Sequence, residues 1–266
     1  MKWAIFRKSI RDSWKGMFGW GIGLGLYALL VIGLYPSVAE QKADFEKIMD
    51  NYPDSMTAIM GTDDLFSPVG YLQSQLMLYL PLLLGIYAIL QGLNAVTGEE
   101  RKQTMDTLAA LPIPRWQILT EKFLATLVIM VGILTQFFLS LVIGRMLWPE
   151  LDISYDKLAA VTYASLLPIM VIAGVAFLLS AVLPMHRRWG GIISSLFLVG
   201  TYLIYALGNA SKTIEPFQPF TPFEYYNTIK ILEGGLPLGD ILVLTVAILL
   251  LWAASLYTFE RRDLGT

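Results

Sequence analysis

The chain has 266 residues, of which 56% are hydrophobic and only 15% are charged, and its net charge is −2. Soluble domains carry about 25% charged residues, so this composition excludes an ordinary soluble globular domain. The chain also contains no cysteine, which excludes disulfides, thiolate metal sites and cysteine nucleophiles. We therefore expect a membrane protein.

Six apolar runs are each long enough to cross a hydrocarbon core of about 30 Å, which takes about 20 helical residues. Because backbone groups in lipid have no water to bond to, each run must form a helix. The sequence thus predicts an all-α integral membrane protein with one transmembrane domain over residues 1–266. The predicted spans are 17–35, 71–94, 119–147, 158–183, 190–207 and 238–257.

The positive charges predict the orientation of these spans. When the 19 Lys and Arg residues are assigned to alternating sides of the membrane, 13 fall on one side and six on the other. The richer side includes both chain ends and faces the cytoplasm by the positive-inside rule. The poorer side includes an acidic extracellular loop at 36–70.

Residues 1–16 precede the first span and combine cations with aromatic residues. Trp3, Phe6, Ile10 and Trp14 recur at helical spacing among lysines and arginines. That pattern is typical of an amphipathic helix that lies in the headgroup layer. The plainer alternative is a basic flank that only sets the topology.

Small residues spaced four apart occur in two spans. Gly19 and Gly23 lie in the first span, and Gly191 and Ser195 lie in the fifth. Such residues let helix backbones approach closely in lipid. They fit either an interface with a second subunit or packing within the same chain.

Neutral polar residues lie inside several spans, where acidic residues are nearly absent. We name Gln73, Gln91, Gln136 and Thr201 as candidates for a substrate pathway. Hydrogen bonds between neighbouring helices are the alternative role for such groups.

A short charged helix is predicted between the second and third spans, within the loop 97–114. Thr97 and Glu100 have the spacing of a capping box, Met105, Leu108 and Leu111 form one apolar edge, and Pro112 ends the helix. From the residues alone, docking of a soluble partner and a simple connector are equally good interpretations.

The extracellular segment 208–237 alternates prolines with phenylalanines and then tyrosines. It is too apolar for a free loop and too interrupted by proline for a span. We expect short re-entrant or outer-face helices here, between spans five and six.

Residues 99–122 resemble the first cytoplasmic loop of ABC-2 type exporter permeases. The similar residues are Glu99-Glu100-Arg101-Lys102-Gln103-Thr104-Met105-Asp106, then Leu108, Pro112-Ile113-Pro114-Arg115, Ile118 and Lys122. Gln103 stands where that family commonly has glycine. The ending Phe259-Glu260-Arg261-Arg262-Asp263-Leu264 is also similar to the family's, as is the six-span layout with both termini inside.

This resemblance implies a permease of an ATP-driven exporter in a prokaryotic plasma (inner) membrane. It implies a second permease subunit, identical or paralogous, and two copies of a separate ABC ATPase that carries ATP and Mg. Residues 99–111 would be the coupling helix that docks on the ATPase. Its contact residues would be Glu99, Glu100, Thr104, Met105, Leu108, Leu111 and Pro112.

The sequence offers no chemistry of its own to drive transport. It has no phosphate-binding loop and no cluster with metal-ligand spacing, and its single histidine, His186, has no catalytic partner nearby in the sequence. We expect no catalytic residue, no metal and no cofactor on this chain, and membrane lipid rather than nucleic acid around it. A secondary carrier or channel that needs no ATPase is the alternative. The cargo is left open among drugs, lipids, peptides and ions.

Overall fold

The computed structural model describes residues 3–40, 66–98, 114–183, 187–208 and 210–261, together with all their side chains except that of Arg187. Every regular element within these ranges is a helix. They are α1 (Ala4–Glu40), α4 (Pro68–Leu72), η1 (Gln73–Met77), α5 (Leu80–Asn94), α8 (Arg115–Leu147), α9 (Tyr155–Ala164), α10 (Leu166–Val182), α11 (Arg187–Gly208), η2 (Glu215–Phe220), α12 (Thr228–Gly234) and α13 (Leu238–Arg261).

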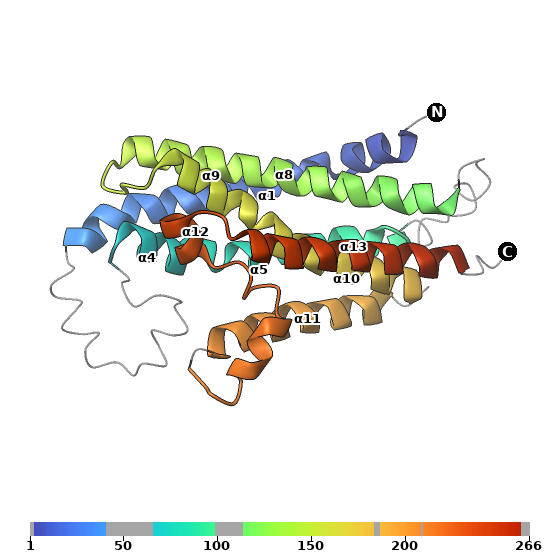
Figure 1. Ribbon diagram of the computed structural model, residues 1–266. Helices are drawn as coiled ribbons and strands as arrows, with labels where there is room; N and C mark the ends of the chain where they lie inside the picture. Colours follow the sequence, from blue (N-terminus) through green and yellow to red (C-terminus); the bar gives the residue numbers. More distant parts are fainter. Residues whose placement is uncertain (1–2, 41–65, 99–113, 184–186, 209, 262–266) are drawn as a thin grey trace.

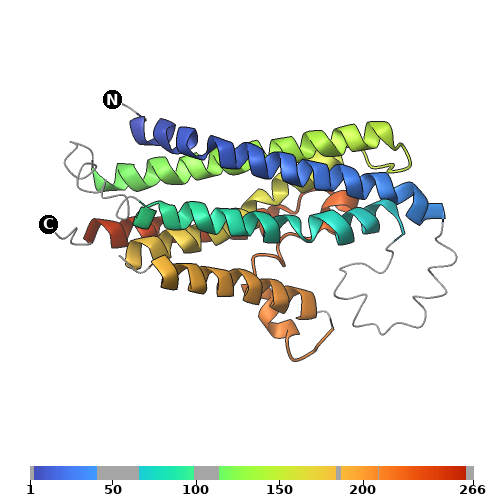
Figure 2. The ribbon, with the colours of Figure 1, turned by 180° about the vertical axis from the view of Figure 1, so that it is seen from behind.

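Six of these helices or helical runs are long and apolar enough to cross a membrane, in agreement with the predicted number of spans. They form a bundle in which both chain termini lie at the same end (Figure 1). We call this the terminal end and the opposite one the far end. The rear view shows the same arrangement, with α1 and α8 lying side by side along the bundle (Figure 2).

The parallel pair α1 and α8 forms one layer of the bundle. Gly21 of α1 packs against Gln136, and Gly25 packs four residues later against Ser140. A Cβ atom at either glycine would collide with the facing side chain. Small residues thus bring the two backbones together, as expected for helices that associate by packing in lipid.

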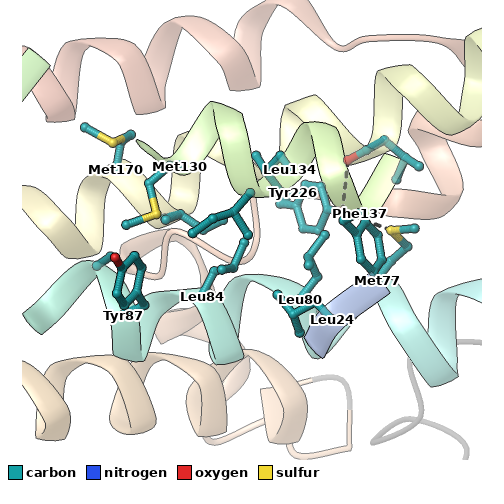
Figure 3. Close-up of a cluster of buried hydrophobic side chains, with 14 of the residues drawn as sticks. Leu24, Met77, Leu80, Leu84, Tyr87, Met130, Leu134, Phe137, Met170 and Tyr226 are labelled. Atoms are coloured by element: carbon teal, nitrogen blue, oxygen red, sulfur yellow. Dashed lines mark hydrogen bonds between the residues drawn. The ribbon is translucent and has the colours of Figure 1, made fainter. Parts of the chain in front are cut away.

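Spans two, four and six form the adjoining layer, in which α10 packs against both α5 and α13. Gly92 of α5 faces Ala173 and Ala176 of α10, while Gly174 of α10 faces Leu251 of α13. The core between the two layers is filled by large apolar side chains (Figure 3). The labelled members include Leu80, Leu84, Met130, Leu134 and Phe137.

Spans two and four are both interrupted near a proline, and in each a tyrosine from another segment donates to a backbone carbonyl. Proline has no N–H and its ring crowds the preceding turn. Near Pro81, η1 has a π-helical winding, and the Tyr27 hydroxyl of α1 donates to the Gln75 carbonyl at 2.8 Å. Before Pro168, α9 gives way to α10, and the Tyr226 hydroxyl donates to the Val161 carbonyl at 3.0 Å.

The segment between spans five and six contains two short helices, η2 and α12, which pack on α11 and α9 respectively. Tyr226 extends from this segment into the core, beside Met77 and Phe137 in Figure 3. Tyr202 and Tyr205 of α11 contact the ring of Phe223, with ring centroids 5.7 and 6.3 Å apart. The prolines therefore divide this segment into short helices that pack on α11 and α9, and the segment does not form a seventh span.

Residues 4–40 form a single helix, without the boundary that we expected near residue 16. At 1.5 Å per residue this helix is about 55 Å long, whereas the hydrocarbon core is about 30 Å thick. Its first turns therefore continue past the expected span at the terminal end, alongside α8.

Candidate functional site

The predicted partner-binding residues of segment 99–111 lie outside the described residues. They are Glu99, Glu100, Thr104, Met105, Leu108, Leu111 and Pro112. The structure does describe the two flanks of this segment, residues 95–98 and 114–122. Both flanks lie at the terminal end and connect to several spans, so we take them as the candidate site.

The flank at the end of α5 is held by two other spans. The Lys122 ammonium of α8 donates to the Ala95 carbonyl at 2.6 Å. The Ser180 hydroxyl of α10 accepts from the N–H groups of Val96 at 3.2 Å and of Thr97 at 3.4 Å, and it donates to the Leu93 carbonyl at 3.1 Å. The last carbonyls of a helix have no partner within it, so these contacts satisfy the end of α5.

Thr97 differs from its expected role as a helix cap. Its hydroxyl donates to the Leu93 carbonyl, one turn back, and its own backbone is already helical. The other half of the expected capping box, Glu100, lies outside the described residues.

The flank at the start of α8 contacts two further helices. Arg115 donates from its guanidinium to the Glu260 carbonyl of α13 at 3.4 Å. The Glu121 carboxylate accepts the N–H of Phe6 at 3.0 Å and the side-chain amide of Gln117 at 2.7 Å. The Phe6 N–H belongs to the first turn of α1, which has free N–H groups and the positive end of the helix dipole.

The charges of these α8 residues match the helix ends that they contact. A carboxylate meets the N-terminal turn of α1, while cations meet C-terminal carbonyls of α5 and α13. Each pairing follows the favourable sign of the helix dipole. The first two turns of α8 thus connect the terminal ends of three other helices.

A polar cavity of about 200 Å³ lies beside this junction, between α1, α5 and α8. Ser9, Asp12, Ser13, Asn94 and Lys122 contribute polar groups to its wall. Gln91, one of the predicted pathway residues, also lines it; its amide accepts from Ser13 at 3.3 Å and donates to Tyr87 at 2.8 Å.

The other three predicted pathway residues lie in separate contacts. Gln73 is buried in η1, and its side-chain oxygen has no hydrogen-bond partner among the described residues. Gln136 donates to the Gly132 carbonyl at 3.1 Å and fills the space beside Gly21. Thr201 donates to the Phe197 carbonyl of its own helix at 2.7 Å. The structure does not bring the four together around one cavity.

Of the four predicted interfacial residues, Trp3 directly precedes α1, and Phe6, Ile10 and Trp14 lie in its first turns. Trp3 and Trp14 are 47% and 49% exposed, whereas Phe6 and Ile10 are half-buried. On the opposite side Ile5 is buried against Ile118 of α8. The aromatic residues therefore have an outward face, but the segment is also attached to the bundle.

The structure separates the two small-residue registers of span one. Gly21 and Gly25 face α8, whereas Gly19 and Gly23 have no atom within 4 Å of a Cβ position and face outward. In span five, Gly190 and Ser194 are buried, and Gly191 and Ser195 line a largely apolar groove of about 710 Å³ between α5 and α11. Gly19, Gly23 and Ser195 are thus exposed, whereas Gly191 is half-buried and a Cβ atom there would lie 3.7 Å from Leu93.

Sequence reasoning missed Glu121 and Ser180 as functional candidates. Glu121 had a detectable signal, since it is a carboxylate beside a lysine at the edge of an apolar run. Ser180 had none, because a lone serine in a membrane helix most often bonds to its own backbone. Within the described ranges no group of three His, Asp or Glu side chains is arranged to hold a metal ion.

The model of a family described as ABC-2 family transporter protein matches residues 3–264. A comparison with curated proteins gives no match. The family match covers nearly the whole chain, including all six spans and the junction at the start of α8. This chain therefore belongs to the ABC-2 transporter family and is a multi-pass membrane transporter component.

Proposed function

We propose that the protein is the permease subunit of an ATP-driven exporter and that separate ABC ATPase subunits bind it through residues 99–111. The observation that carries this proposal is the junction at the start of α8. A segment that resembles a coupling helix leads directly into a helix bonded to the ends of α1, α5 and α13. Force applied to that segment would reach several spans at once.

The charge distribution supports a cytoplasmic position for the terminal end. The side with 13 of the 19 Lys and Arg residues includes both termini and segment 99–113. By the positive-inside rule this side faces the cytoplasm, where an ATPase would bind ATP and Mg. In this proposal the membrane is a prokaryotic inner membrane and transport is outward.

The distribution of buried charge favours an external energy source over ion coupling. Proton- and sodium-coupled carriers keep ionisable groups at membrane depth. The buried charged side chains in the described part of the chain are Glu121 and Lys122, and both lie near the terminal end of α8. Their partners are helix ends, which gives them a structural connection rather than a place in a proton relay.

We further propose that two permease copies pair, identical or paralogous, with the translocation route formed between them. Gly19 and Gly23 on α1, and Gly191 and Ser195 on α11, would contact the second copy. Support comes from the outward position of Gly19 and Gly23, because the alternate pair, Gly21 and Gly25, already packs against α8. ATP-driven closure of the ATPase pair would then rock the two copies against each other.

Replacing Met105 or Leu108 with aspartate is expected to abolish co-purification of the ATPase while the permease still inserts in the membrane. Each substitution places a charge on the apolar edge predicted to contact the ATPase, where a buried unpaired charge is strongly unfavourable. The measurement is affinity purification of the permease from membranes, followed by detection and activity assay of the bound ATPase.

The matched control for these variants is Gln103→Asp, which adds the same charge on the opposite side of the predicted helix. It should retain the ATPase. If both apolar-edge variants bind ATPase as well as the wild type does, residues 99–111 are not the docking segment. Nucleotide-independent transport by the purified chain alone in liposomes would instead favour an ATPase-independent carrier.

Replacing Gly23 with leucine is expected to convert a complex with two permease copies into one with a single copy. A Cβ atom at Gly23 has no atom of the described residues within 4 Å, so the variant should fold, and only an intermolecular contact would be blocked. Mass photometry of the solubilised complex reports the copy number. Gly239→Leu, at an equally open position on α13, should leave it unchanged; an unchanged number in Gly23→Leu would exclude this surface as the interface.

A further inference from the structure

The helix of span two ends irregularly just before segment 99–113. Regular α5 ends at Asn94, residues 95–96 form a turn, and helical backbone resumes at Thr97. A turn between two helical pieces can bend more easily than a continuous helix, because it lacks regular backbone hydrogen bonds. Without contacts to other helices, this turn would bend when segment 99–113 is displaced, and the displacement would not reach the rest of span two.

Two side chains from other spans hold this turn from both sides. Lys122 donates to the Ala95 carbonyl at 2.6 Å, and Ser180 accepts from the Val96 and Thr97 N–H groups. Lys122 is 7% exposed and Ser180 is fully buried. Hydrogen bonds between buried groups are stronger than those exposed to water.

Ser180 also bonds on both sides of the turn. Its hydroxyl donates to the Leu93 carbonyl of α5 while it accepts from the residues beyond the turn. It therefore fixes the end of α5 relative to the start of the next helical piece. Since Ser180 lies in the last turn of α10, it also ties both pieces to span four.

We propose that Lys122 and Ser180 brace the turn at residues 95–96, so that movement of segment 99–113 displaces spans two, three and four together. Both are positioning residues in this role and contact neither nucleotide nor cargo. The inference rests on the proposed function, because it assigns the brace to transmission of the ATPase stroke.

The test measures transmission across the bundle in the complete permease–ATPase complex in liposomes. The chain has no cysteine, so nitroxide labels can be placed uniquely at Lys157→Cys and Lys212→Cys, two exposed positions on the far-end segments. Double electron–electron resonance gives the distance between the labels without nucleotide and after trapping with ATP and vanadate.

In the labelled protein in which Lys122 and Ser180 are unchanged, trapping with ATP and vanadate is expected to change the distance between the two labels. Ser180→Ala and Lys122→Met, each tested singly, are expected to lose the shift while they still retain the ATPase, trap vanadate and give the nucleotide-free distance. The matched control is Ser255→Ala, a buried serine whose hydroxyl donates to the Leu251 carbonyl of its own helix at 2.7 Å. It should keep the full shift.

A full change of distance in both Ser180→Ala and Lys122→Met would overturn the inference. Loss of the nucleotide-free distance in both variants would also overturn it, because the two residues would then only maintain the fold. Failure of the proposed function is seen separately, as a wild-type permease that never co-purifies with an ATPase. The two variants lie on different helices, so an unstable one does not remove the test.

Discussion

Replacing Gly92 with leucine is expected to destabilise the protein more than any other single glycine substitution proposed for this bundle. A Cβ atom at this position would lie 2.7 Å from the Ala176 Cβ, 2.9 Å from the Ala173 carbonyl oxygen and 3.0 Å from the Phe177 nitrogen. Two of these atoms belong to the α10 backbone and cannot move aside as a flexible side chain would. Overpacking typically costs about 1–3 kcal/mol, and a rigid backbone contact places this variant at or above the upper limit.

The measurement for Gly92→Leu is the thermal unfolding midpoint of the detergent-solubilised protein. Tryptophan fluorescence monitors the unfolding. Gly200→Leu provides a matched control, because it introduces the same side chain into span five at a position with no atom within 4 Å of a Cβ. The control should unfold near the wild-type temperature. Equal midpoints for the two variants would mean that α5 and α10 are not in close backbone contact.

Removing the hydroxyl of Tyr226 by substitution with phenylalanine is expected to cost about 1–3 kcal/mol, the usual penalty for a buried polar group that loses its partner. The lost partner is the Val161 carbonyl. At the interruption between α9 and α10, the Ser165 N–H bonds to the Tyr163 carbonyl, so it does not continue the regular helical bond to Val161. A tyrosine hydroxyl is neutral at pH 7 even at its ordinary pKa of about 10, and burial raises the pKa of Tyr226 further, so this hydroxyl is a neutral donor.

The effect of Tyr226→Phe can be separated from a general effect of losing a tyrosine hydroxyl. Tyr225 is the adjacent residue, and its hydroxyl donates to the Pro219 carbonyl at an exposed position. Tyr225→Phe should therefore change the unfolding midpoint little, since water replaces the lost partner. If both variants unfold alike, Tyr226 does not support the interrupted span.

The sequence predicted the spans well because length and hydropathy are properties of each segment alone. An apolar run of about 20 residues must be a helix in lipid, whatever it packs against. The six-span fold and the membership of the ABC-2 family followed from such local features. The helix boundary expected at residue 16 is absent for a physical reason: a change from charged to apolar residues marks where lipid begins, but it does not end a helix.

The sequence did not determine which residues far apart in the chain contact each other. Both glycine registers of span one have the same spacing, and only the packing of α8 shows that Gly21 and Gly25 face inward. Glu121 accepts from a backbone N–H 115 residues away in the chain, and Ser180 accepts from one 84 residues away. Backbone N–H and C=O groups are identical at every position, so no residue type identifies which of them a side chain will meet. The sequence alone determined the spans and the family, whereas the tertiary structure decided which helix ends are joined, because only folding brings those ends within hydrogen-bonding distance.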